Sequence, residues 1–170
     1  LLGRKSGRGF YRYPDGAPPL PVAAHEAPRT AGEVTVHGVG AIADVLDVAA
    51  TRALARQGWG PARQHDSDWT GVAIDEARLV MTDGRSAAEM AAALGCAEIA
   101  VFDRLPGVPT SPGTAIAFAT GPDASNAWRG QAAAWLAALG FSPLRVADCP
   151  GLVVARTVAM LINEAADAVQ

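Results

Sequence analysis

Apolar and polar positions follow two different periods along this chain. Short β-branched and apolar runs predict strands at residues 33–38, 78–84, 97–103, 114–121 and 143–148. Apolar residues at helical spacing predict helices at residues 40–58, 86–95 and 124–140. Strands that alternate with helices indicate an α/β fold, and we expect a parallel sheet with helices on both faces.

Capping residues support these boundaries. Ser86 and Glu89 form an S-x-x-E capping box, and Gly95 should end the helix that they start. Gly58 should close the first helix in the left-handed conformation, and Asp123 should cap the third helix.

The last segment, residues 151–170, has the pattern of a helix with little polar surface. Its polar side chains fall in one narrow stripe, made up of Arg156, Thr157, Asn163, Glu164 and Asp167. One αβ unit cannot cover so much apolar surface. We therefore expect Gln170 to be a truncation point, and residues 1–13 and 152–170 to pack on neighbouring chains or to be poorly ordered.

Composition limits the classes of protein that fit. The chain has 170 residues, of which 50% are apolar and 18% are charged, and its net charge is −3. This length suits about one globular domain, and the charge gives no nucleic-acid footprint. No apolar run reaches the ~18 residues of a membrane span. Cys96 and Cys149 are too few for a disulfide framework, so we expect reduced thiols and a cytoplasmic protein.

Two segments precede the first strand. Residues 1–13 are basic and aromatic, and residues 14–32 are rich in Pro and Ala, as in an extended linker. Basic residues mixed with aromatic ones can stack on and pair with nucleic acid, so an RNA-binding tag at residues 3–13 is one candidate function.

The sequence GVGAIA, residues 38–43, follows a predicted strand and opens a predicted helix. Gly38, Gly40 and Ala43 fit the G-x-G-x-x-G/A fingerprint of dinucleotide binding, and both glycines should serve the backbone geometry of a tight turn. Asp44 would place a negative charge where a pyrophosphate must lie, and the expected acidic residue after a second strand is represented only by a late Asp66. We expect a vestigial site, and a nucleotide-binding or sensor module that uses this turn is the alternative.

Other catalytic patterns are weak. His25, His37 and His65 lack the spacing of metal ligands, and neither a P-loop nor a G-x-S-x-G elbow occurs. His37 ends a strand beside the glycine-rich turn, where a structural role and a functional one both fit. We expect no metal site.

Two separated motifs resemble one family. LGRKSGRGFYRYPDG, residues 2–16, is similar to the GRK-[ST]-G-x-GFY-x-Y segment that ends the helical C-terminal domain of L-3-hydroxyacyl-CoA dehydrogenases. DCPGLVVARTVAMLINEA, residues 148–165, is similar to the start of that domain, D-x-PGF-x-x-NR followed by NEA. Residues 118–148 resemble the strand, helix and strand that lead into it.

The order of these motifs resembles the duplicated, long bacterial 3-hydroxybutyryl-CoA or 3-hydroxyacyl-CoA dehydrogenases. It implies four parts: the end of a first helical domain (1–13), a Pro-rich linker (14–32), a reduced Rossmann-like domain (33–149) and the start of a second helical domain (150–170). The parent would oxidise the 3-hydroxyl of an acyl-CoA by hydride transfer to NAD, as in the β-oxidation of fatty acids. Its partners would be other domains of the same chain and a homodimer mate, with neither nucleic acid nor membrane.

The family's catalytic residues are absent from the matching positions. Val101, Phe102 and Asp103 stand where the family has the His of H-F-x-N-P. Residues 115–119, AIAFA, replace the segment L-V-E-V with its Glu, and Ala155 replaces the Asn of PGF-x-x-NR. Without the His no base takes the hydroxyl proton, and without the Glu nothing orients that base. We expect no catalytic residue and no bound NAD in this chain, but a structural role that holds the second helical domain against the first.

Overall fold

The computed structural model describes residue 28 and residues 32–105 and 113–169. The predicted segment 1–13 and almost all of the linker at 14–32 lie outside these residues. The elements follow one another as β1 (Val34–His37), α1 (Ala41–Leu54), the 3-10 helix η2 (Ala55–Gln57), β2 (Ala62–Gln64), β3 (Gly71–Ile74), β4 (Ala77–Met81), α2 (Ala87–Leu94), β5 (Ile99–Phe102), β6 (Thr114–Thr120), α3 (Asn126–Ala138), β7 (Phe141–Arg145) and α4 (Val154–Asp167).

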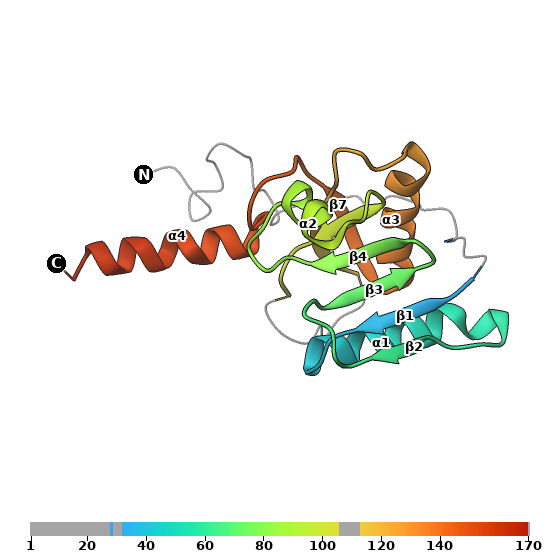
Figure 1. The fold of residues 1–170 in the computed structure, drawn as a ribbon. Coiled ribbons are helices and arrows are strands. Elements are labelled where there is room, and N and C mark those ends of the chain that lie inside the picture. Colours follow the sequence, from blue (N-terminus) through green and yellow to red (C-terminus); the bar gives the residue numbers. More distant parts are fainter. Residues whose placement is uncertain (1–27, 29–31, 106–112, 170) are drawn as a thin grey trace, which may run out of the picture.

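The strands form one sheet in the order β2-β1-β3-β4-β5-β6-β7 (Figure 1). The pairs β1/β2, β4/β5 and β6/β7 are parallel, whereas β1/β3, β3/β4 and β5/β6 are antiparallel. The α/β class is confirmed, but the prediction of a parallel sheet is wrong because the sheet is mixed. Parallel neighbours need a crossover of a dozen or more residues. The two residues between β3 and β4 can only make a hairpin.

Sequence analysis missed β2 and β3. β2 is a polar edge strand of three residues, too short to show a period. β3 and β4 are joined by a turn in which Asp75 has a φ of 50°. Asp is one of the few residue types that adopt this conformation in two-residue hairpins, so the sequence did carry a signal for β3. Gly71 is required in this hairpin because a Cβ there would collide with the carbonyl oxygen of Leu79.

Helices cover both faces of the sheet, as predicted. One face packs against α1 and α3 over a large core whose members include Val36, Leu46, Phe102, Phe118 and Trp135. The other face packs against α2 in a smaller cluster that includes Val80, Met90, Ile99, Val101 and Leu152. The strands of the centre therefore carry apolar side chains on both sides, which explains why their sequences are continuous apolar runs.

The predicted capping box of α2 is present. The hydroxyl of Ser86 accepts from the backbone N–H of Glu89, and the carboxylate of Glu89 accepts from the backbone N–H of Ser86. Gly95 follows this helix with a φ of 59°, so its predicted C-cap is confirmed. Gly58 is left-handed as predicted, with a φ of 80°, but it closes η2, because α1 itself ends at Leu54 with Ala55 as its C-cap.

The cap of α3 differs from the prediction. Ser125, rather than Asp123, accepts the backbone N–H of Trp128 at 3.0 Å. Ser and Asp are nearly equivalent N-cap residues, so the sequence could not separate two candidates this close. The tertiary structure does so, because the backbone N–H of Ser125 donates to the carboxylate of Glu98 at 3.1 Å.

α4 projects from one end of the sheet domain and buries none of its residues (Figure 1). Leu161 and Ile162 are each 63% exposed, so the apolar surface predicted for this helix is present and lies open. Leu152 departs from the prediction for residues 152–170, because it is buried within the domain itself. None of the helices in the described ranges has the length and apolar character that a bilayer-spanning segment requires.

Candidate functional site

The carboxyl ends of β1, β4 and β5 line up at one edge of the sheet. In the register, His37 lies opposite Gly71, Gly71 opposite Val80, and Val80 beside Val101. α1 and α2 begin at this edge because they directly follow β1 and β4. In open α/β sheets ligands bind outside the carboxyl ends of the strands, so this edge is the candidate site.

The glycine-rich turn lies at this edge and has the predicted backbone geometry. Gly38 has a φ of 94° and Gly40 a φ of 87°, so both glycines adopt conformations that L side chains rarely reach. Gly40 is the N-cap of α1 and Ala43 is fully buried under this helix start. No side chain caps this helix end.

Two of the sequence arguments against nucleotide binding are weakened here. β2 runs parallel to β1, so β1, α1 and β2 form a βαβ unit that the sequence did not reveal. Arg63 in β2 donates to the carboxylate of Asp44 at 3.0 Å and to the carbonyl of Ala43 at 2.6 Å. This ion pair offsets part of the charge that Asp44 brings to the turn.

The chain itself, however, fills the space beside the turn. A Cβ on Gly38 would lie 2.7 Å from Oγ1 of Thr70 and 3.0 Å from the carbonyl oxygen of Trp69. These two residues lead into β3, which lies directly next to β1. In a nucleotide-binding turn, the missing side chain of this glycine lets the pyrophosphate come close to the backbone. Here Trp69 and Thr70 of the chain itself occupy that space.

His37 takes part in the same packing. Its Nδ1 lies 2.6 Å from the hydroxyl oxygen of Ser67, and its ring stacks on Trp69 with ring centroids 4.1 Å apart. Burial, and then the positive charge of Arg78, lower the pKa of His37. Among the described residues no group of His, Cys, Asp and Glu side chains could hold a metal ion. The contacts of His37 favour a structural role.

A second location at this edge brings together the segments that resemble the family's catalytic motifs. β5 pairs with β6, with Phe102 opposite Phe118, and Asp103 follows β5 directly. The backbone N–H of Ala155, in the first turn of α4, lies 3.4 Å from Oδ1 of Asp103. The three segments that resemble the family's His, Glu and Asn motifs thus converge around Asp103.

The carboxylate of Asp103 fills this location. It is 1% exposed, and its Oδ2 accepts the backbone N–H groups of Val153 at 2.9 Å and Val154 at 2.7 Å. Oδ1 also accepts the N–H of Arg104 at 2.8 Å. The N-cap residue of α4 is Val153, whose side chain cannot accept a hydrogen bond, so Asp103 supplies the cap from β5. A negative charge at a helix N-terminus is also favoured by the macrodipole.

A second carboxylate, from the segment that leads to α4, caps a helix of the sheet domain. Asp148, in the segment that leads to α4, accepts the N–H groups of Ala87 at 2.7 Å and Ala88 at 3.0 Å, at the start of α2. Together with the capping box, this satisfies the first turn of α2. Sequence reasoning missed the capping role of both carboxylates. It treated Asp103 only as part of the stretch that lacks the family's His, and Asp148 only as part of a motif.

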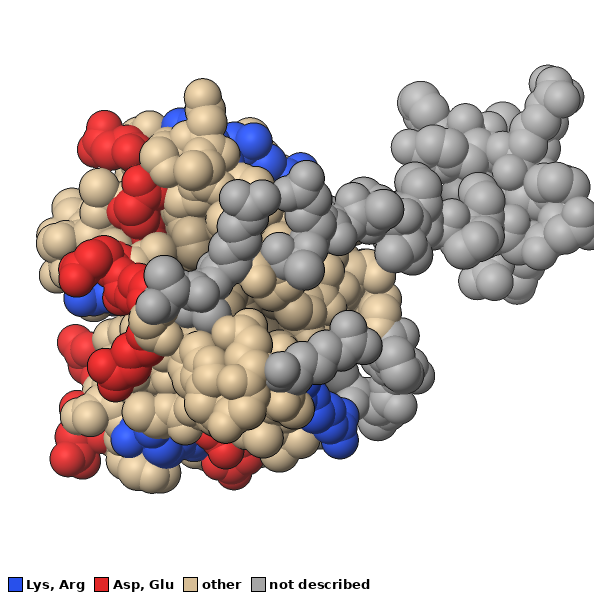
Figure 2. All heavy atoms as spheres, turned by 90° about the vertical axis from the view of Figure 1, so that its right-hand side faces the viewer, with Lys and Arg blue, Asp and Glu red and all other residues tan. Residues whose placement is uncertain are grey.

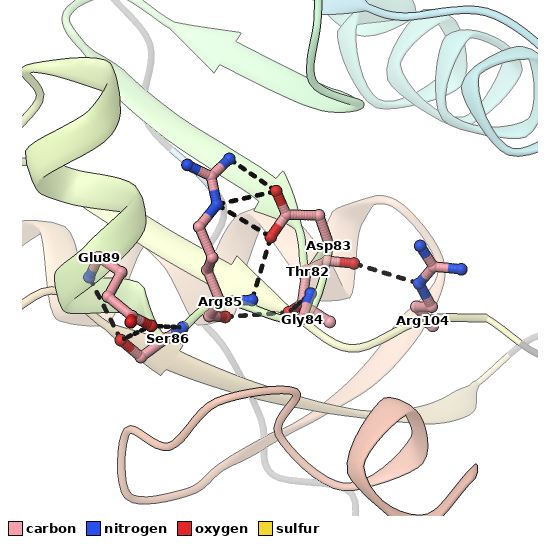
Figure 3. A network of polar contacts seen from close by, with 7 residues as sticks. All are labelled: Thr82, Asp83, Gly84, Arg85, Ser86, Glu89 and Arg104. Carbon is pink, nitrogen blue, oxygen red and sulfur yellow. Dashed lines mark hydrogen bonds and ion pairs between the residues drawn. The ribbon is translucent and has the colours of Figure 1, made fainter. Parts of the chain in front are cut away.

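The turn between β4 and α2 adds further polar contacts (Figure 3). The side chains of Asp83 and Arg85 form an ion pair at 2.6 Å, and hydrogen bonds from Arg85 lower the pKa of Asp83. Thr82 is fully buried, its hydroxyl accepts from Gly84, and its carbonyl accepts from Arg104 at 3.4 Å. The turn at this edge is thus held by hydrogen bonds among neighbouring residues of the chain itself.

Residues 79–150 match the family model of the 3-hydroxybutyryl-CoA dehydrogenase reduced Rossmann-fold domain. The 3-hydroxyadipyl-CoA dehydrogenase of Escherichia coli (strain K12) is 37% identical over 97 residues, which are 57% of this chain and 19% of that enzyme. The resemblance to 3-hydroxyacyl-CoA dehydrogenases is confirmed. A crystal structure of 3-hydroxybutyryl-CoA dehydrogenase from Escherichia coli K12 has the same fold, with a TM-score of 0.59 and 23% identity over 99% of this chain and 28% of that chain.

The extent of these matches separates the two locations. The chain spans less than a third of the length of either relative. The matched reduced Rossmann-fold domain begins in β4 and ends at Pro150, so it contains Asp103 and Asp148. The glycine-rich turn at residues 38–43 lies outside it.

Proposed function

We propose that this chain is a non-catalytic, reduced Rossmann-like domain of a longer NAD-dependent 3-hydroxyacyl-CoA dehydrogenase, where it holds a helical domain in place. The proposal rests on one observation. The carboxylate of Asp103 caps α4 at the place where the three motif segments meet. Both oxygens of this buried carboxylate already accept backbone N–H groups, so it is not placed to take a proton from a substrate hydroxyl.

The activity belongs, in this proposal, to the rest of the parent. The relatives are dehydrogenases named for 3-hydroxyadipyl-CoA and 3-hydroxybutyryl-CoA. By analogy, the parent oxidises the 3-hydroxyl of an acyl-CoA with NAD in the cytoplasm, and the partners of this chain are the parent's other domains. The Asp103 and Asp148 contacts support such a role, because they join the sheet to the helix that follows it.

The first test is turnover by the chain itself. With acetoacetyl-CoA and NADH we expect no loss of NADH absorbance, because no residue at the convergence of the motifs can act as the base. Gly40→Glu, which would block the glycine-rich turn, is the matched variant. A rate that follows the chain through purification and disappears in Gly40→Glu contradicts the proposal.

Two observations favour a second candidate, a nucleotide sensor at the glycine-rich turn. The two positive φ angles and the complete βαβ unit are features that a nucleotide site needs. We expect calorimetry with NADH to show no binding, because Trp69 and Thr70 already pack against Gly38. A micromolar dissociation constant that tightens in Asp44→Asn would favour the sensor.

The open surface of α4 suggests self-association of this chain when other helices are absent. Val158, Leu161 and Ile162 are large apolar residues, each at least 49% exposed. An apolar patch of this kind drives association, and a homodimer would cover it. Light scattering of the chain should show a mass above that of the monomer, and Leu161→Lys with Ile162→Lys should reduce it. A strict monomer at high concentration would contradict this assignment.

An RNA-binding role is less well supported by the surface. Figure 2 shows acidic side chains gathered along one side of the face in view, with Lys and Arg side chains in separate groups. The described part of this face therefore offers no continuous basic stripe along which a phosphate backbone could lie. The basic segment at residues 3–13 lies outside the described residues, and a salt-dependent shift with an oligonucleotide would test it.

A further inference from the structure

We propose that Asp103 and Asp148 are positioning residues that together set the direction in which α4 leaves the sheet domain. The inference deepens the proposed function and rests on it, because direction matters only for a domain that holds another one. Each carboxylate belongs to one side of the joint and binds a helix N-terminus on the other side.

Asp103 ties the sheet to α4. Its side chain comes from the end of β5, and its two oxygens accept the successive N–H groups of Val153, Val154 and Ala155. The next N–H, that of Arg156, bonds to the carbonyl of Gly151. Because several directional hydrogen bonds converge on one buried carboxylate, this tie fixes the position of the first turn of α4 at the end of β5.

Asp148 ties the connecting segment to α2. Its two oxygens each accept one N–H, from Ala87 and Ala88, so this contact is also bidentate. Between the two ties, Leu152 is 2% exposed and inserts into the α2 side of the core. Leu152 has a φ of 49° and follows Gly151 at 71°, so the connection turns sharply at the point where it is held.

The remainder of α4 does not orient the helix. It buries none of its residues on the sheet domain, and Figure 1 shows it extending away from the sheet. With the Asp103 contact alone, α4 could still rotate about its first turn. Two bidentate ties and the buried Leu152 between them define an axis, and so they determine where the apolar surface of α4 faces.

The test is the orientation of α4 in solution, measured by residual dipolar couplings of the backbone amides in this chain. In the unaltered chain, couplings from α4 and from the sheet should fit one alignment tensor. In Asp103→Ala and in Asp148→Ala, we expect the α4 couplings to shrink and to lose the common tensor, while those of the sheet remain. Asp123→Ala, which removes an exposed carboxylate before α3, is the matched control and should change neither set.

Asp103→Asn keeps the test valid if the alanine variant does not fold, because an amide oxygen still accepts from the helix but one oxygen of the bidentate contact is lost. We expect a partial loss of the α4 couplings in this variant. Retention of the common tensor in Asp103→Ala or Asp103→Asn overturns the proposal. Loss of the sheet signals in both variants overturns it too, since Asp103 would then serve the core rather than the joint. NADH binding or turnover bears on the proposed function and leaves this result unaffected.

Discussion

Two helix N-termini at the same edge of the sheet are built in opposite ways. α1 starts at Gly40, with positive φ and no capping side chain. α4 also starts at a residue that cannot cap it, but the buried carboxylate of Asp103 takes its first N–H groups. No side chain accepts the first N–H groups of α1, whereas a carboxylate that follows β5 accepts those of α4.

This difference shows two ways in which the chain's own residues can occupy a helix start at the edge of a sheet. A helix N-terminus attracts a negative group, and in nucleotide-binding folds that group is a phosphate. At α4 the negative group belongs to the protein. At α1 the turn is retained, but Trp69 and Thr70 pack against it. The family model matches residues 79–150, which include Asp103 but neither the first turn of α4 nor the glycine-rich turn.

The largest expected change in stability comes from removing the carboxylate that caps α4. Asp103→Ala should lower the free energy of unfolding by about 3 kcal/mol, because a buried charged acceptor and its backbone partners lose each other. Asp123→Ala, at an exposed position, should stay within about 0.5 kcal/mol. Urea unfolding measures both. Equal midpoints for the two variants would show that α4 does not depend on the carboxylate.

The two glycines of the turn should differ in how much stability is lost when each is replaced by alanine. Gly38→Ala should cost about 2 kcal/mol or more, and Gly40→Ala about 1 kcal/mol, since both positions have positive φ. The added cost at Gly38 comes from Thr70 and Trp69, whereas a Cβ at Gly40 meets nothing within 4 Å. Thermal unfolding of both variants checks the order. A reversed order would mean that Trp69 and Thr70 do not press on the turn.

The region beside α1 should also lose stability as pH falls. The folded-state pKa of His37 is lowered from its ordinary value of about 6.5, first by burial and then by Arg78. Below about pH 6.5 the unfolded chain binds the proton more readily, so stability should decrease from there down to the folded pKa. His37→Phe, which keeps a ring to stack on Trp69, should remove this decrease. The same variant at His65, an exposed position, should leave it intact.

The smallest expected effect is at the start of α2 and has its own pH window. Hydrogen bonds from the backbone and side chain of Ser86 lower the pKa of Glu89. Its contribution is therefore present above the ordinary carboxyl pKa of about 4.5 and is lost as pH falls through the folded value. Glu89→Gln should flatten the acid limb of the stability curve more than Glu164→Gln does. Equal acid limbs would show that the capping box holds no preference for the ionised form.

Sequence reasoning succeeded where local rules decide the outcome. The capping box at Ser86, the C-caps at Gly58 and Gly95, and the positive φ of Gly38 and Gly40 follow from backbone sterics and short-range hydrogen bonds. The motif near Asp148 indicated the resemblance to 3-hydroxyacyl-CoA dehydrogenases, which the comparisons confirm. The prediction that the catalytic side chains are absent rests on residue identity alone and stays a prediction.

The direction of the strands and the closure of the sheet edge were decided by the tertiary structure. The β3/β4 hairpin depends on a two-residue turn, and its place beside β1 depends on pairing between strands far apart in the sequence. Asp103 and Val153 are 50 positions apart, so no local pattern shows that this carboxylate caps that helix. Local sterics act within a few residues, whereas a cap supplied by another element exists only once packing brings the two together. For that reason the sequence alone determined most of the elements and the resemblance to the dehydrogenases, and only the folded chain determined what occupies the edge of the sheet.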